Sequence, residues 1–163
     1  MKRLKILSLF LLLISMYSCS KDENEPQMVI QKTIFEHVAS SMNYSYLTYA
    51  LQKTDLDDVL NGEGDYTLYA PNNSAFIGFL MRGGYSTLDE VPTEALKKLL
   101  LNHVMVGQIR YRDFKSGYYP TAASSDVNDR PLSMHINQVN MRVTLNGSSR
   151  IVQGNVNASN GVI

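Results

Sequence analysis

The chain has 163 residues, enough for one ordinary domain, and with 44% hydrophobic and 18% charged residues it is not a wholly disordered protein. Basic and acidic residues number 15 each, but three of the basic ones lie in an N-terminal segment that we expect to be removed, leaving 12 against 15 and a net charge of −3. This balance offers no basic surface to a phosphate backbone, so we expect no nucleic-acid partner.

The N-terminal segment has the pattern of a secretory signal. Three basic residues precede an apolar run at 6–17, which is shorter than the roughly 20 residues of a transmembrane helix. Cys19, the only cysteine, follows a small residue at the end of this run, which resembles the lipobox of bacterial lipoproteins, where the thiol receives a diacylglyceryl group. We expect 1–18 to be a lipoprotein signal peptide and Cys19 the lipidation site. The alternative is a plain signal peptide with an incidental cysteine.

Residues 19–30 are predicted to form a flexible acidic tether behind the lipidated cysteine. Segment 20–26, Ser-Lys-Asp-Glu-Asn-Glu-Pro, has no apolar side chain to bury. An acidic run at this place is also similar to the export tags of some Gram-negative surface lipoproteins. The expected contact with a membrane is the lipid itself, since each buried CH₂ contributes about 0.8 kcal/mol. The expected location is the bacterial cell envelope, at the outer membrane or the cell surface.

Helices are predicted first in the remaining chain. Thr33 can cap a helix over 33–39, and helical spacing of apolar residues continues through 40–51. A short helix at 55–60 has acidic residues in its first turn, where the helix dipole favours them.

A strand, a stop and a helix cap are packed into 66–76, Tyr-Thr-Leu-Tyr-Ala-Pro-Asn-Asn-Ser-Ala-Phe. The aromatic and β-branched residues at 66–69 predict a strand, and Pro71 ends it. Asn72 or Asn73 can then cap a helix that continues with apolar residues at helical spacing. The segment resembles the first signature of the fasciclin (FAS1) domain family, with Tyr69 where that family usually has Phe.

Residues 93–106 predict the clearest helix, capped by Thr93 and ended by Gly107. Its apolar residues fall on one face, and His103 lies among them with no Cys, Asp or Glu in ligand spacing. We therefore expect a core histidine bonded to backbone. The segment 99–107, Leu-Leu-Leu-Asn-His-Val-Met-Val-Gly, resembles a pattern that fasciclin domains carry between their two signatures.

From Gln108 onward the apolar period changes to 2, which predicts strands at 132–136 and 141–145. His135 alternates with apolar neighbours and is expected in solvent. Tyr118-Tyr119-Pro120 is interpreted as a loop, where two aromatic side chains are either a contact site or rest on the surface.

The last residues are the third segment, after 66–76 and 99–107, that resembles the fasciclin family. Seven of the eight residues at 156–163, Val-Asn-Ala-Ser-Asn-Gly-Val-Ile, fit the second fasciclin signature, with Asn155-Val156 in place of Asp-Ile. The remainder of that signature does not follow, and we expect a domain that is truncated or has a short final strand.

The resemblance covers most of 31–163 and implies an α+β fold: a wedge-shaped β-sandwich with helices along one side, a helix-rich first half and a strand-rich second half. The family's adhesion role implies partner contacts, for which the candidates here are Asn155, Val156, Tyr118 and Tyr119. In animal members the Asp-Ile pair and a Tyr-His pair are linked to integrin recognition. Because Asn155-Val156 and Asn102-His103 stand at these positions, that activity is not carried over. Residues expected to hold the core are Thr67, Pro71, Phe76, His103, Asn160 and Gly161.

The predicted function is that of a lipid-anchored adhesion module that binds a surface protein or a carbohydrate. The alternative is an accessory scaffold lipoprotein that captures extracellular glycan or helps to assemble the envelope. The sequence shows no nucleophile elbow, paired-carboxylate cleft or metal-ligand cluster, so we expect neither an enzyme nor a cofactor or metal.

Overall fold

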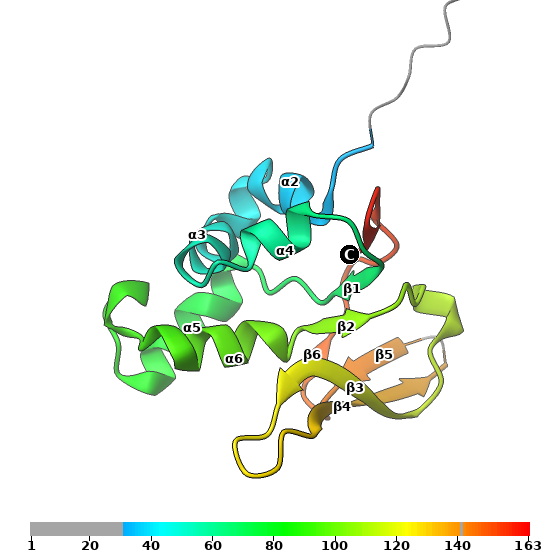
Figure 1. Cartoon of the computed structure of the whole chain (residues 1–163). Coiled ribbons are helices and arrows are strands. Elements are labelled where there is room, and N and C mark those ends of the chain that lie inside the picture. Colours follow the sequence, from blue (N-terminus) through cyan, green and yellow to red (C-terminus); the bar gives the residue numbers. More distant parts are fainter. Residues whose placement is uncertain (1–30, 141) are drawn as a thin grey trace, which may run out of the picture. The chain divides into compact units, whose positions relative to one another are not determined.

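The computed structural model describes residues 31–140 and 142–163 (Figure 1). Outside the described residues lie the predicted signal peptide 1–18, the lipidation site Cys19 and the tether 19–30. The helices are α2 (Ile34–Ala39), α3 (Ser45–Lys53), α4 (Asp57–Asn61), α5 (Asn73–Gly83) and α6 (Thr93–Leu101), with 3-10 turns at Met42–Tyr44, Leu88–Glu90 and Tyr111–Asp113. The strands are β1 (Tyr66–Leu68), β2 (Val104–Val106), β3 (Gly117–Ser124), β4 (Pro131–Val139), β5 (Arg142–Leu145), β6 (Ser149–Arg150), β7 (Asn157–Ala158) and β8 (Gly161–Val162).

The strands form two four-stranded sheets with orders β2-β1-β8-β7 and β3-β4-β5-β6. All strand pairs are antiparallel except β1 with β8. The helices precede most of the strands and gather on one side of the first sheet (Figure 1). The predicted α+β fold, with a helix-rich first half and a strand-rich second half, is confirmed.

Side-chain alternation in β1 and β2 gives the first sheet two buried faces. Leu68 and Val104, which are paired, belong to a core cluster with the helices. Tyr69 and Met105 point to the opposite side and belong to a cluster with β4 and β5 of the second sheet. The first sheet is therefore the middle layer, because successive side chains on a strand face opposite ways.

Side-chain hydrogen bonds cap helices α2 and α5 at the residues predicted from the sequence. Thr33 and Glu36 form a capping box at α2, each side chain accepting from the backbone N–H of the other. Asn72 caps α5, its Oδ1 accepting from Ala75 N–H at 3.0 Å. Gly84, at φ 72°, ends α5 in the left-handed conformation that glycine adopts without strain.

Helix α6 differs from its prediction at both ends. Pro92 occupies the N-cap position and Thr93 makes no side-chain capping bond. The helix ends at Leu101 rather than at residue 106, and Val104–Val106 is strand β2, paired with β1. His103 lies in the turn between them, where its carbonyl accepts from Tyr69 N–H at 2.9 Å. The corner at 66–76 and the segment 93–106 thus lie together as predicted, joined by a sheet ladder.

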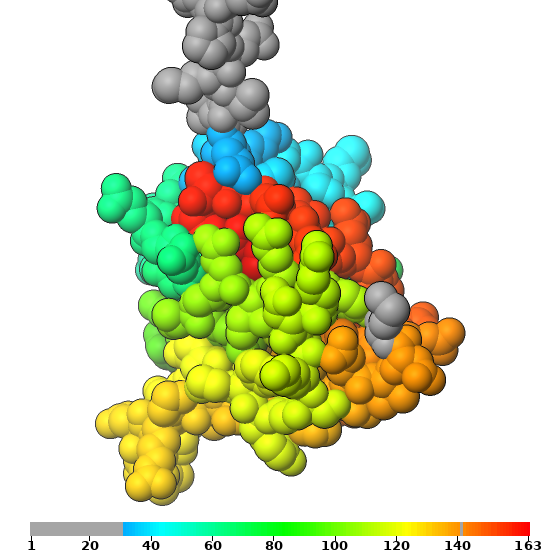
Figure 2. All heavy atoms as spheres, turned by 90° about the vertical axis from the view of Figure 1, so that its right-hand side faces the viewer, coloured from blue at the N-terminus to red at the C-terminus, as the bar shows by residue number. Residues whose placement is uncertain are grey.

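The short strand β8 lies inside its sheet, between β1 and β7, and ties the C-terminal residues to the start of the domain. Figure 2 shows these residues (red) directly below the first described residues (blue). Asn160 is 4% exposed; its Oδ1 accepts from Ile34 N–H at 2.9 Å, and its Nδ2 donates to the carbonyls of Leu60 and Gly62, both at 2.8 Å. A Cβ on Gly161 would lie 2.1 Å from the Tyr66 carbonyl oxygen, so only glycine fits here.

Candidate functional site

The outward side of sheet β3-β4-β5-β6 is open to solvent and carries most of the exposed polar side chains of the strands. Tyr119, Met134 and Val143 point inward to the second core cluster. Their neighbours along each strand therefore point outward. The outward residues that concern us are Tyr118, His135, Asn137, Arg142, Thr144 and Arg150, and we call this surface the open face.

An aromatic pair lies at one end of the open face. Tyr118 on β3 is directly opposite His135 on β4, and their ring centroids are 4.8 Å apart. Tyr118 is 77% exposed, whereas His135 is half-buried, which differs from the solvated position expected of it. The Tyr118 ring thus has a neighbour that orients it and a large surface free for contact.

Polar and cationic residues occupy the rest of the open face. Strand register places Asn137, Thr144 and Arg150 in one row across β4, β5 and β6. Arg142 lies two residues from Thr144 along β5, opposite Val139. Asn137, Val139, Asn140, Arg142 and Thr144 line a shallow hollow of about 500 Å³.

The open face is positively charged, because no Asp or Glu points outward from these four strands. Among residues 31–140 and 142–163 the guanidinium groups of Arg142 and Arg150 have neither an ion pair nor a hydrogen bond. The ion pair of this part of the chain joins Lys98 and Asp126 instead. The arginines of the open face are therefore available to an anion.

The two tyrosines at 118 and 119 do not lie in a loop, as the sequence had suggested, but in strand β3, and so they face opposite ways. Tyr119 points inward, packs edge-on against Phe114 at 5.8 Å, and its hydroxyl bonds both backbone groups of Lys115 at 3.0 Å. Only Tyr118 is placed for contact with a partner.

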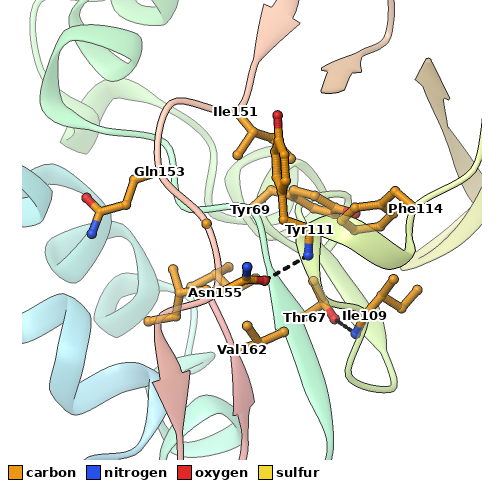
Figure 3. A pocket seen from close by; sticks show the side chains of 12 residues that line it. Thr67, Tyr69, Ile109, Tyr111, Phe114, Ile151, Gln153, Asn155 and Val162 are labelled. Carbon is orange, nitrogen blue, oxygen red and sulfur yellow. Dashed lines mark hydrogen bonds between the residues drawn. The ribbon is translucent and has the colours of Figure 1, made fainter. Parts of the chain in front are cut away.

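Asn155 and Val156 do not belong to the strands of the open face, and both are engaged in hydrogen bonds to the backbone. Asn155, at φ 63°, accepts from Tyr111 N–H at 2.8 Å through Oδ1 (Figure 3). Val156 exchanges two backbone hydrogen bonds of 3.0 Å with Ile163. The structure therefore does not join the predicted contact residues into one site.

The pocket beside Asn155 lies between the sheets and is too small for a ligand. Its volume is about 40 Å³, room for a few water molecules at most. Thr67 lines this pocket, and its hydroxyl group already has hydrogen-bond partners: Oγ1 donates to the Gly107 carbonyl at 2.6 Å and accepts from Ile109 N–H at 2.9 Å (Figure 3). This pocket lies between the two sheets, and its volume is smaller than a sugar ring or a peptide segment requires.

Tyr69 also lines this pocket and is the one buried side chain of the described residues whose polar atom has no partner. Its ring packs in the second core cluster, 6.0 Å from Phe114. Burial, and to a lesser degree the neighbouring Tyr119, raises the pKa of the Tyr69 phenol far above its ordinary value.

The other residues expected to hold the core lie in or beside it. Thr67 and Phe76 are buried and Pro71 is half-buried, and Phe76 stacks on Tyr46 with centroids 6.1 Å apart. His103 is half-buried, and its Nδ1 donates to the Leu99 carbonyl at 2.8 Å. Burial lowers the pKa of His103, and the Leu99 bond partly opposes this.

Within the described residues no three His, Cys, Asp or Glu side chains come close enough to hold a metal ion. Over the same part of the chain no helix has the length and apolar character needed to cross a bilayer.

Sequence reasoning missed Asn137, Arg142, Thr144 and Arg150 as surface partners. Arg142 and Thr144 alternate with apolar residues in the predicted strand 141–145, which indicates an outward face, whereas Asn137 and Arg150 lie outside the predicted strands. Their joint position depends on the register of three strand pairs, which the alternation alone does not specify.

Comparison with known proteins points to one family. The family model for the fasciclin domain matches residues 42–163. Protein sll1483 of Synechocystis sp. is 30% identical over 131 residues, covering 80% of this chain and 68% of that protein. A solved FAS1 domain pair from the insect cell adhesion molecule Fasciclin I is similar with a TM-score of 0.63 at 16% identity, over 81% of this chain; the chain spans 48% of that structure, about half its length.

Proposed function

Because the chain belongs to the fasciclin domain family, we propose that it is a cell-adhesion or binding module, held at the bacterial cell envelope by a lipid on Cys19. Fasciclin domains are adhesion-related modules, and a similar solved structure comes from a cell adhesion molecule. The partner is a surface protein or a glycan. The module binds and does not catalyse.

The open face is the observation that carries this proposal. It combines an exposed aromatic ring at Tyr118 with hydrogen-bonding and cationic side chains on a rigid sheet. Sites on regular strands hold their side chains in fixed positions, which favours recognition over induced rearrangement. The same exposed ring favours the second candidate function, an accessory scaffold that captures extracellular glycan. The face of an aromatic ring packs well against the C–H face of a sugar ring, whose hydroxyl groups lie at its edge.

An adhesion assay tests the proposal. Beads coated with the protein are expected to attach to intact bacterial cells or to surfaces bearing envelope glycans, and Tyr118→Ala is expected to reduce attachment. Tyr49→Ala serves as the matched control, because Tyr49 is also exposed but belongs to α3, outside the open face. Equal loss in both variants, or no attachment of wild type to any surface, would reject the proposal.

The anchor is tested separately in a bacterial host. Wild type is expected in the membrane fraction with diacylglyceryl on Cys19, detected by mass spectrometry. Cys19→Ser is expected to move the protein to the soluble fraction, because the lipid supplies the membrane affinity. A variant that stays with the membrane without lipid would refute the anchoring part of the proposal.

A further inference from the structure

We propose that the open face binds a carboxylated polysaccharide, with a sugar ring lying on Tyr118 and sugar carboxylates paired with Arg142 and Arg150. This inference rests on the proposed binding function and names the chemical class of the partner. Three features of residues 31–140 and 142–163 support it: the exposed ring of Tyr118, the guanidinium groups of Arg142 and Arg150 without a partner, and the small number of large apolar side chains exposed on the open face.

Tyr118 provides the stacking surface. Its ring is 77% exposed on a strand whose backbone is fixed by pairing with β4, and His135 lies against one side of it. A flat apolar ring with a polar edge suits the C–H face of a sugar, whose hydroxyl groups remain in solvent. Asn137 and Thr144, further along the face, supply acceptors and donors for hydroxyl groups.

Arg142 and Arg150 supply the charge recognition. Arg150 lies directly opposite Thr144, and Arg142 lies two residues from Thr144, so the two arginines flank it. From strand spacing and rise, their Cα atoms are about 8 Å apart, and Arg150 is about 16 Å from Tyr118. Guanidinium groups bind planar carboxylates with two parallel hydrogen bonds. These separations require an extended chain of several sugar units rather than a single sugar.

The composition of the open face disfavours a folded protein partner. Tyr118 and Val139 are the large apolar side chains exposed on it among the described residues, and Val139 lies four residues along β4 from His135, the strand partner of Tyr118. Protein interfaces bury an apolar core in which aromatic and arginine side chains are surrounded by further contacts. A polar, cationic surface with one stacking ring matches an anionic glycan better.

The test measures binding of the protein to polygalacturonate, with dextran as the neutral polysaccharide and poly-glutamate as the carboxylated polypeptide. Wild type is expected to bind polygalacturonate, to bind dextran at least about tenfold more weakly, and to lose affinity as salt is raised, because exposed charge pairs are screened. Arg142→Gln/Arg150→Gln is expected to weaken binding to polygalacturonate about tenfold or more. Tyr118→Ala is expected to weaken it without changing the salt dependence.

Arg82→Gln is the matched control, because Arg82 is an exposed arginine on helix α5 and does not belong to any of the four strands of the open face. Unfolding temperatures of all variants establish that they fold. Equal binding to dextran, tighter binding to poly-glutamate, or the same loss in Arg82→Gln would each overturn the inference. Wild type that attaches to cells but not to polygalacturonate overturns the glycan class and leaves the adhesion proposal standing; wild type that attaches to nothing overturns both.

Discussion

Replacing Tyr69 by Phe is expected to stabilise the protein. The Tyr69 ring is 9% exposed and packs in the cluster between the two sheets, while its hydroxyl has no partner among the described residues. An unpaired buried polar group costs about 1–3 kcal/mol. Phe keeps the ring and its contact with Phe114 and removes the hydroxyl, so the cost disappears without a cavity.

We expect the free energy of unfolding to rise by about 1 kcal/mol in Tyr69→Phe, at the lower end of that range. For a domain of this size the corresponding rise in melting temperature is about 4 °C. Urea unfolding followed by circular dichroism measures the change directly, since a two-state transition gives the free energy from its midpoint and slope.

The same substitution is expected to change how the stability of the protein depends on pH above about pH 10. The folded-state pKa of Tyr69 is raised, so its neutral form is favoured by folding. Above about pH 10 the unfolded chain releases this proton and the folded one keeps it, so stability falls as pH rises towards the folded-state pKa, by at most about 1.4 kcal/mol per pH unit. Tyr69→Phe is expected to lose this part of the slope, and its advantage over wild type should widen above pH 10.

Tyr118→Phe is the control, because it removes a hydroxyl that is exposed on the open face. Its effect on stability is expected to lie within about 0.5 kcal/mol. If Tyr69→Phe instead destabilises the protein by 1 kcal/mol or more, the hydroxyl has a partner such as a buried water, and the reasoning from an unpaired group is refuted.

Three further substitutions test the fold and its titration. Asn160→Ala removes the three hydrogen bonds of a buried side chain and is expected to destabilise by about 3–5 kcal/mol in urea unfolding; a loss below 1 kcal/mol would contradict the assigned bonds. Gly161→Ala forces a Cβ against the Tyr66 carbonyl and should cost more than about 3 kcal/mol, whereas Gly117→Ala, which has open space around it, should change little. The lowered pKa of His103 gives stability that is present above about pH 6.5 and lost as pH falls through the folded-state pKa; His103→Gln should flatten this acid slope between pH 7 and pH 5, and an unchanged slope would assign it to other groups.

Local signals in the sequence predicted the parts of the fold that depend on near neighbours. The caps at Thr33 and Asn72 need only the next few N–H groups, and both were found. The apolar stripe of α6 needs only helical spacing, and Leu96 and Leu100 are buried as expected. Each of these interactions spans four residues or fewer.

Pairing between strands that are distant in the sequence determines the elements that the sequence predicted wrongly. Val104 continues the helical stripe of α6 and is also a good strand residue, and the ladder with β1 determines which applies. Gly117 and Pro120 were interpreted as loop residues around the tyrosines. Pro120 is tolerated in β3 because this strand is the edge of its sheet, where an N–H can be missing without loss of a ladder bond.

The same distinction separates the family motifs from the surface that we propose to bind. Thr67, Asn160 and Gly161 belong to the recognisable blocks, and each is fixed by buried bonds or by a close backbone approach. The open face draws its residues from 118–150, outside the blocks at 66–76, 99–107 and 156–163. Motifs whose residues make buried bonds or close backbone contacts identify the fold, and they carry no information on what a solvent-facing sheet contacts. The ligand of this domain therefore has to be inferred from the charges and rings on that sheet.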